Sequence, residues 1–139
     1  GGFATGSMLG SGGFIVYNDT SCIVRNTWNF SRFYHHESCG QCSPCREGTG
    51  WLEKVLHRIE NGHGREEDIE LLWSIQSKIE GNTICPLGDA AAWPVAAAIR
   101  HFKDEFEYHI RFPEKIKNRE HFVNEPFEKV KHLIAKELV

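Results

Sequence analysis

Apolar residues recur at helical spacing in four stretches of the chain. The first such stretch begins after Asp19 and Thr20, two residue types that cap helix N-termini well. We expect a helix to begin at one of these two residues. Its apolar side is formed by Ile23, Val24, Thr27, Trp28, Phe30 and Tyr34.

Two further stretches predict a pair of antiparallel helices joined by a short turn. The earlier helix begins around Cys45 and ends at the turn residues Asn61 to Gly64, and the later one runs from Arg65 to Ile79, before Gly81 and Asn82. Such a hairpin returns the chain close to the point where it left, so residues just before and just after the pair are expected to meet. The apolar sides are formed by Trp51, Leu52, Val55, Leu56 and Ile59, and by Ile69, Leu72, Trp73, Ile75 and Ile79.

A fourth helix is expected to start at Asp89 or Pro94 and to run to Tyr108. Pro94 would suit a first turn, where its missing N–H is not needed. The apolar stripe of this helix is formed by Val95, Ala98, Ile99, Phe102 and Phe106. Pro113 is expected to end the domain. Residues 113–139 then form a C-terminal extension with one amphipathic helix, whose stripe of Phe127, Val130, Leu133, Ile134 and Leu138 packs on this chain or on another subunit.

The N-terminal residues have a different pattern. Residues 1–13 are rich in glycine and lead into the β-branched and aromatic run 14–17, which predicts a short strand. A dinucleotide-binding fingerprint places its glycines between a strand and a helix, so no phosphate binding is expected here. We expect residues 1–18 to be the end of a preceding β-rich domain and residues 19–112 to form the helical domain. The fold class predicted is mainly α, a small antiparallel helical bundle with a short N-terminal strand.

Composition narrows the functional classes. With 139 residues, 40% hydrophobic and 25% charged, the chain has the size and composition of one ordinary globular domain. Its net charge of -3 gives no basic field for nucleic acid. The longest apolar run, from Ala90 to Ile99, is well short of the roughly 20 residues that cross a bilayer. Direct membrane insertion is therefore not expected.

Four of the five cysteines form a metal-ligand pattern. Cys39, Cys42 and Cys45 are spaced three residues apart, and Cys85 follows at a distance, directly before Pro86. Three thiols from one tight loop and one from elsewhere suit the corners of a 4Fe-4S cluster, whereas zinc sites usually combine two separate pairs. A structural four-cysteine zinc domain that only mediates protein contacts stays open as an alternative. Colour distinguishes them, because an iron–sulfur protein is brown and a zinc protein is colourless. Disulfides would leave an odd thiol and need an oxidising compartment, for which the sequence shows no signal peptide.

Other polar residues near this pattern have simpler interpretations. Cys22 is expected to be a small buried residue rather than a ligand, because free cysteine packs well in cores. His35 and His36 are expected to be a solvated pair. Arg46 either stabilises a negatively charged cluster or pairs with Glu47 or Glu37.

The two cysteine segments also carry a resemblance to a known family. Residues 37–49, which hold Cys39, Cys42 and Cys45, and residues 84–94, which hold Cys85, resemble the C-terminal part of the flavin-bearing, NADH-oxidising subunit of respiratory complex I, which is the F subunit of NADH-quinone oxidoreductase. NAD-linked hydrogenases and formate dehydrogenases share this module. The resemblance extends over about residues 1–112 and includes both motifs intact.

The resemblance implies a function and a ligand set. It implies a 4Fe-4S cluster held by Cys39, Cys42, Cys45 and Cys85, which takes electrons from an NADH-reduced FMN and passes them to a cluster of a neighbouring subunit, towards quinone. FMN and NADH would bind to a part of the protein outside this chain, so no catalytic residue is expected here. The chain would be a fragment of an NADH dehydrogenase, in a multi-subunit complex that is cytoplasmic and attached to the inner membrane through partner subunits.

Overall fold

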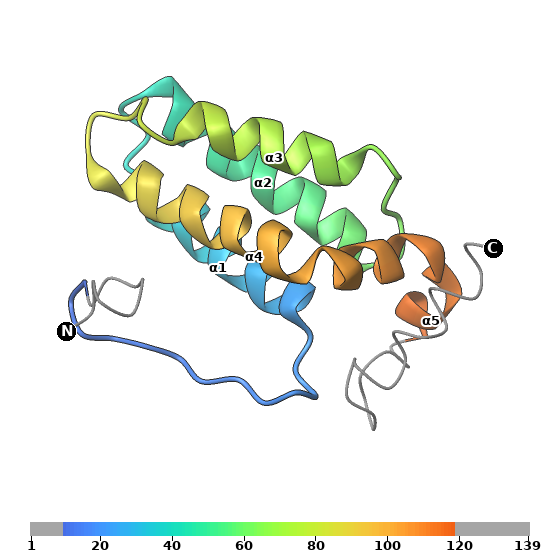
Figure 1. The fold of residues 1–139 in the computed structure, drawn as a ribbon. Helices are drawn as coiled ribbons and strands as arrows, with labels where there is room; N and C mark the ends of the chain where they lie inside the picture. Colours follow the sequence, from blue (N-terminus) through green and yellow to red (C-terminus); the bar gives the residue numbers. More distant parts are fainter. Residues whose placement is uncertain (1–9, 119–139) are drawn as a thin grey trace.

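The structure is a computed structural model, and it describes residues 10–118. These residues form helices and connecting segments, with no strand among them, which confirms the mainly α fold class (Figure 1). The helices are α1 (Ile23–Glu37), α2 (Ser43–Glu60), α3 (Asp68–Ile79), α4 (Pro86–Arg111) and the short α5 (Pro113–Lys117).

The four long helices form an antiparallel bundle around one core. Helix α1 packs on α2 and α4, and α3 also packs on α2 and α4, so each long helix has neighbours on two sides (Figure 1). Most residues of the predicted apolar stripes face inward, and each large apolar side chain that is fully buried contributes about 1.5–3 kcal/mol. The core includes Val24, Leu52, Leu56, Ile59, Leu72, Ile79, Val95 and Phe106.

Helix α1 begins later than the sequence predicts. Its N-cap is Cys22, whose Sγ accepts a hydrogen bond from the backbone N–H of Arg25 at 3.5 Å. The expected caps, Asp19 and Thr20, lie in a turn instead. The side chain of Asn18 holds this turn, because its Oδ1 accepts hydrogen bonds from the hydroxyls of Thr20 and Ser21.

Helix α4 begins earlier than predicted and bends. It starts at Pro86, so Pro94 lies in the helix interior rather than in the first turn. At Phe102 the backbone leaves helical geometry, with φ -131° and ψ 31°, and the helix kinks there. Phe102 is therefore 42% exposed, contrary to its expected place on the buried stripe. After the kink, the buried face is formed by Glu105, Phe106, Tyr108 and His109.

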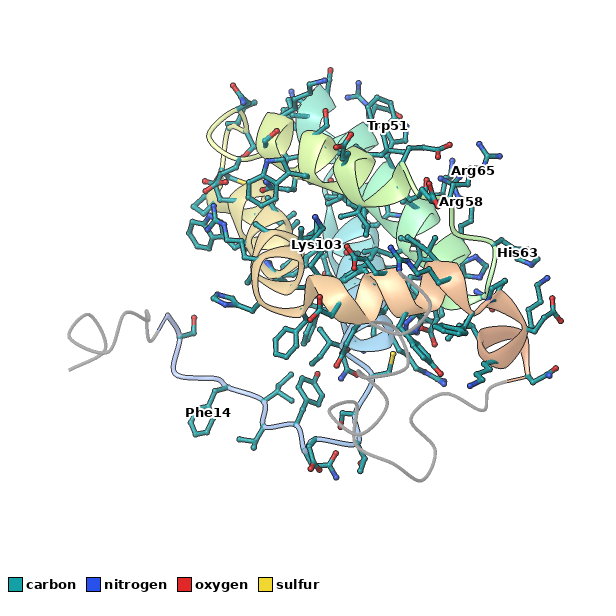
Figure 2. All side chains as sticks on the ribbon, turned by 45° about the vertical axis from the view of Figure 1, so that its right-hand side comes forward. Phe14, Trp51, Arg58, His63, Arg65 and Lys103 are labelled. Atoms are coloured by element: carbon teal, nitrogen blue, oxygen red, sulfur yellow. The ribbon has the colours of Figure 1, made fainter. Side chains whose placement is uncertain are left out.

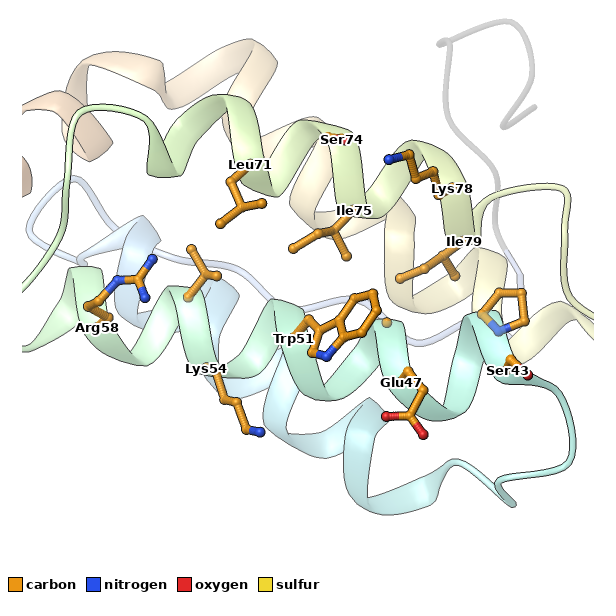
Figure 3. Close-up of a pocket in the computed structure, with 13 residues that line it drawn as sticks. Ser43, Glu47, Trp51, Lys54, Arg58, Leu71, Ser74, Ile75, Lys78 and Ile79 are labelled. Carbon is orange, nitrogen blue, oxygen red and sulfur yellow. The ribbon is translucent and has the colours of Figure 1, made fainter.

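Two tryptophans expected in the core lie at the surface. Trp51 is 54% exposed and lies over a groove of about 620 Å³ between α2 and α3, whose lining includes Leu71 and Ile75 (Figure 3). Trp73 is 37% exposed, and the guanidinium of Arg100 lies over its ring, 5.1 Å from the centroid. Both indoles therefore lie at the edges of helix contacts, Trp51 beside α3 and Trp73 beside Arg100 of α4.

The hairpin of α2 and α3 is closed by one buried carboxylate. Asp68 is 1% exposed and lies in the first turn of α3. Its Oδ2 accepts hydrogen bonds from Arg58 Nε at 3.0 Å and from the backbone N–H of Arg65 at 2.9 Å, while Arg58 Nη2 donates to Oδ1. The hydrogen bonds that Arg58 donates to Asp68 also raise the pKa of Arg58. Figure 2 shows Arg58, Arg65 and His63 around this turn, which confirms the turn predicted after residue 60.

The predicted terminal elements are only partly described. Residues 13–18 have neither helix nor strand geometry, and Phe14, Ile15 and Val16 are exposed on the segment that leads into α1 (Figure 2). A strand needs a partner strand, and residues 10–118 supply none, so the strand at 14–17 stays a prediction. Residues beyond Pro113 continue to pack on the bundle through Ile116, which is 1% exposed. The amphipathic stripe from Phe127 to Leu138 lies outside the described residues.

Candidate metal centre

All four predicted ligands lie at one end of the bundle. Cys42 is the N-cap of α2 and Cys85 is the N-cap of α4, while Cys39 lies in the segment between α1 and α2, and Cys45 in the first turn of α2. Figure 1 shows the α1–α2 and α3–α4 connections at the same end. Pro44 and Pro86, each in a first turn, fit helix starts at these points because that turn needs no donor from them. The antiparallel hairpin therefore brings the distant thiol to the three-thiol loop.

The four thiols differ in burial. Cys45 is 6% exposed and Cys42 is half-buried, whereas Cys39 and Cys85 are exposed. A cofactor held by these sulfurs would be covered by protein on the side of α2 and would lie near the surface on the side of Cys39 and Cys85. The helix starts at Cys42 and Cys85 also direct two positive helix ends toward the sulfurs, which favours a negatively charged cofactor.

A serine hydroxyl contacts one of the predicted ligand sulfurs. Ser38 Oγ lies 3.1 Å from Cys45 Sγ and accepts a hydrogen bond from the backbone N–H of Gly40 at 3.3 Å. Gly40 has φ +77°, a conformation that glycine adopts without strain and that turns its N–H toward the serine. With the Gly40 N–H as its donor, the Ser38 hydroxyl can direct its own hydrogen to the sulfur. The sequence analysis did not predict this contact. Its one indication in the sequence is that Ser38 directly precedes Cys39.

Arg46 forms hydrogen bonds that hold the loop of Cys39, Cys42 and Cys45, and it also pairs with a carboxylate. Its Nη1 donates to the carbonyl of Gly40 at 2.8 Å, its Nη2 to Ser43 Oγ at 3.3 Å, and its Nε to Glu47 Oε1 at 3.1 Å. The sequence left a choice between an electrostatic role and an ion pair with Glu47 or Glu37. The structure shows the pair with Glu47 together with two contacts that hold the ligand loop.

The loop that carries Cys85 is seated against the start of α4. A Cβ on Gly88 would lie 2.3 Å from Thr83 Cγ2 and 2.5 Å from Thr83 Oγ1. Thr83 Oγ1 in turn donates to the carbonyl of Cys85 at 2.9 Å. The backbone N–H of Gly81 donates to Asp89 Oδ1 at 2.7 Å. The absence of a side chain at Gly88 thus allows the contact that positions the fourth ligand.

A second glycine positions the end of α3. A Cβ on Gly48 would lie 2.6 Å from Cγ1 of the fully buried Ile79. The end of α3 can therefore approach the second turn of α2 closely. This end of α3 comes directly before the loop that leads to Cys85. This close approach holds the two cysteine segments at the same end of the bundle.

The two histidines before the loop differ from each other. His36 is solvated as expected, with a side chain that is 86% exposed and lies 3.2 Å from Glu37 Oε1. His35 is less exposed, and its Nδ1 lies 2.5 Å from Glu53 Oε2 on α2. Both histidines are exposed, as expected, and Glu53 is a carboxylate partner for His35 that sequence spacing did not indicate.

The cluster cysteines are not spaced around a single small ion. Within residues 10–118, one group of three or more Cys, His, Asp or Glu ligand atoms lies within 4.8 Å of one another, and it consists of Cys22, Glu60 and His109. A tetrahedral zinc ion with Zn–S bonds of about 2.3 Å would hold its sulfurs about 3.8 Å apart. In the described residues, the thiols at the cluster end therefore do not have the mutual distances of a single zinc site.

A helical bundle with four thiols at one end, two of them at helix N-caps, defines a small metal-binding domain of the iron–sulfur class. Residues 25–109 match the family described as the NADH-ubiquinone oxidoreductase-F iron-sulfur binding region. The chain belongs to this family, and the family's cofactor is a 4Fe-4S cluster.

Curated relatives and a solved structure agree with this assignment. The chain is 53% identical over 106 residues to the F subunit of NADH-quinone oxidoreductase from Rickettsia typhi, and the match covers 76% of this chain and 25% of that protein. It is 49% identical over 107 residues to the F subunit from Mycobacterium tuberculosis, covering 77% and 24%. An NAD⁺-reducing [NiFe]-hydrogenase in the H2-reduced state superimposes with a TM-score of 0.65 at 33% identity, over 68% of this chain and 16% of that one.

The chain spans about a quarter of the length of the curated relatives it matches. Within residues 10–118, no helix is both long and apolar enough to cross a bilayer.

The ligand set can be tested by removing one thiol at a time. Replacing Cys39, Cys42, Cys45 or Cys85 with Ser should lower the iron content from about four per chain by at least one iron, because each thiolate occupies one corner of the cluster. Cys22→Ser is the matched control and should keep its iron, since Cys22 lies at the N-cap of α1 at the opposite end of the bundle. Iron and acid-labile sulfide are measured in all five variants. Full iron in Cys85→Ser with loss in Cys22→Ser would contradict the assignment.

The contact between Gly88 and Thr83, which positions the Cys85 loop, can be tested by adding a single methyl group at Gly88. Gly88→Ala should destabilise the chain by about 1–3 kcal/mol, as overpacking usually does, because its Cβ overlaps Thr83. It should also speed the loss of iron to a chelator. Gly13→Ala is the control, because nothing lies within 4 Å of a Cβ there, and it should change stability by less than about 0.5 kcal/mol. Equal stability and equal iron loss in the two variants would show that the contact is unimportant.

Proposed function

We propose that this chain is an electron-transfer module, in which one 4Fe-4S cluster held by Cys39, Cys42, Cys45 and Cys85 receives and releases single electrons. One observation carries the proposal: the fold brings these four thiols, from segments 40 residues apart, to one end of a rigid bundle. The spacing of the four cysteines along the sequence favours a cluster over the alternative of a structural zinc site.

The residues around the sulfurs have the task of holding and tuning the cluster. The cluster, when bound, changes its net charge between about -2 and -3 as one electron enters or leaves. Burial of Cys45 disfavours the more negative state. The positive ends of α2 and α4, the Ser38 hydroxyl and the Arg46 guanidinium favour it. The balance of these opposing contributions sets the potential.

Electron transfer between centres needs proximity and rigidity rather than acids, bases or nucleophiles. The exposed thiols Cys39 and Cys85 place the cofactor near the surface, where another redox group can approach. The hydrogen bonds of Arg46 and the packing at Gly88 keep the ligand loops from moving as the charge changes. No residue of the described chain is assigned a catalytic role.

The names of the relatives suggest the donor and the wider assembly. The curated relatives are subunits of NADH-quinone oxidoreductase, so we infer that the electrons come from NADH through FMN bound elsewhere in the same protein. They would pass to a cluster of a neighbouring iron–sulfur protein and on toward quinone. The complex would be cytoplasmic and attached to the inner membrane through other subunits.

A second candidate assembly is an NAD-linked hydrogenase. The observation that favours it is the superposition on an NAD⁺-reducing [NiFe]-hydrogenase at 33% identity. The electron-transfer role of the cluster would be the same, but hydrogen would replace quinone as the partner of the overall reaction. An NAD-linked formate dehydrogenase would use the same module. Identification of the proteins that co-purify with the chain decides among these assemblies.

The separation of cluster and NADH site can be tested with the chain alone. Dithionite-reduced protein should reduce an artificial acceptor such as ferricyanide, whereas protein mixed with NADH should not, because the described residues contain no glycine-rich loop that leads into a helix N-terminus. The readout is visible absorption of cluster and acceptor. Addition of the flavin-bearing part of a relative should restore the reaction with NADH. Reduction by NADH in its absence would show that the nucleotide site lies in this chain.

The effect of Arg46 on the potential has a predicted sign. Arg46→Ala should lower the midpoint potential by about 20–40 mV, because a surface charge interaction of about 0.5–1 kcal/mol penalises the reduced state once the cation is gone. Arg46→Lys keeps the charge and should stay close to the wild-type potential. A redox titration followed by EPR measures both variants. If the midpoint potential falls as far in Arg46→Lys as in Arg46→Ala, the loop contacts of Arg46 rather than its charge set the potential.

A further inference from the structure

A second group of metal-ligand side chains lies at the opposite end of the bundle from the cluster cysteines. It combines Cys22 at the N-cap of α1, Glu60 at the end of α2 and His109 near the end of α4. His109 is 0% and Glu60 is 8% exposed, and Cys22 is half-buried. Residues from three different helices thus direct a thiol, a carboxylate and an imidazole to one point.

The histidine is oriented for ligation. Its Nδ1 lies 2.8 Å from the backbone carbonyl of Glu105, which can only accept a hydrogen bond, so Nδ1 carries the hydrogen. Nε2 faces Cys22 Sγ and Glu60 Oε2, and in the neutral ring that ligation requires it would present its lone pair to them. A ligating histidine commonly donates its other N–H to a carbonyl in this way, and this contact fixes both the tautomer and the ring orientation.

The distances among the three atoms fit one tetrahedral ion. His109 Nε2 lies 3.3 Å from Cys22 Sγ and 3.4 Å from Glu60 Oε2, and the Sγ to Oε2 distance is 3.8 Å. Zn–S bonds of about 2.3 Å and Zn–N and Zn–O bonds of about 2.0–2.1 Å place tetrahedral neighbours about 3.4–3.6 Å apart. We propose that Cys22, Glu60 and His109 form a second metal site, which binds one zinc ion with three protein ligands and a water molecule.

The charges of the site suit a divalent cation. A thiolate and a carboxylate with a neutral imidazole carry two negative charges, and the buried Glu105 near Cys22 is a further carboxylate, so a divalent cation lowers the net negative charge of the site. Without metal, burial and then the charge of Glu60 raise the pKa of the Cys22 thiol well above its usual value, so the sulfur holds its proton. Zinc binding would therefore release one proton from Cys22, as it does at other thiolate sites.

The site lies far from the cluster cysteines. Helix α2 runs from the cluster end to Glu60 over 18 residues, which separates the two sites by about 26 Å at 1.5 Å per residue. Cys22 is half-buried, and Glu60 also lines a hollow of about 370 Å³ together with Arg25, His57 and His63. An ion here would join the first turn of α1 to the last turns of α2 and α4.

The experiment uses the whole chain with its cluster in place. The protein is incubated with zinc sulfate and desalted, and iron, acid-labile sulfide and zinc are measured per chain. We expect about one zinc in addition to the full iron content. Zinc K-edge EXAFS should show one sulfur at about 2.3 Å and two or three nitrogen or oxygen ligands at about 2.0–2.1 Å. Zinc held at the cluster cysteines would instead show sulfur ligands alone.

Matched variants locate the ion. Cys22→Ala and His109→Gln should each lower zinc affinity by more than the ~10–100-fold cost of an outer-shell substitution, measured by competition with a chromophoric chelator, while iron content is unchanged. His101→Gln is the control, because His101 is an exposed histidine on the same helix, and it should bind zinc as the wild type does. Zinc should also raise the melting temperature of the wild type but not that of Cys22→Ala.

Three outcomes would overturn the proposal. One is the absence of retained zinc in the wild-type chain, which would leave Cys22, Glu60 and His109 as a hydrogen-bonded group. Another is an all-sulfur EXAFS shell. The third is equal zinc affinity in Cys22→Ala and in the wild type. The EXAFS of the unaltered chain decides the question even if His109→Gln fails to fold.

Discussion

The proposed metal centre depends on close approach between helices at one end of the bundle. Gly48 lets the last residue of α3 lie against α2, and Gly88 lets Thr83 lie against the first turn of α4. Both contacts would be too short with a Cβ in place. They hold the segment that carries Cys85 beside the loop of Cys39, Cys42 and Cys45. Four thiols from two distant segments can share one cofactor only if these helix ends stay fixed.

The protein around the ligand sulfurs combines features of opposite effect. Cys45 is buried, which resists added negative charge, while Ser38 contacts the same sulfur through its hydroxyl. Arg46 supplies a positive charge and also binds the carbonyl of Gly40, so electrostatics and loop geometry are linked through one side chain. Removal of Arg46 alone therefore changes both the electrostatics at the sulfurs and the geometry of the loop, and it cannot separate the two effects.

The two ends of the bundle have different chemistry. The cluster end has exposed thiols and borders the apolar groove beneath Trp51, whereas the other end holds buried polar groups from several helices. There the buried Asp68 closes the hairpin of α2 and α3, and the kink of α4 at Phe102 precedes the turn that buries His109. The polar contacts at this end tie α1, α2, α3 and α4 together far from the redox centre.

The sequence by itself determined the helices and the cysteine ligand pattern, because both rest on short, repeated spacings that act within one segment. It did not determine the partners of Cys22, Ser38 or His35, since those partners come from other turns and helices. Trp51 and Phe102 are exposed although both fit the helical apolar period. Trp51 lies over the groove between α2 and α3, and Phe102 lies at the kink of α4, and both features arise only when the helices pack. Only the tertiary structure decided that Cys22, expected to be a simple core residue, lies beside a carboxylate and an imidazole.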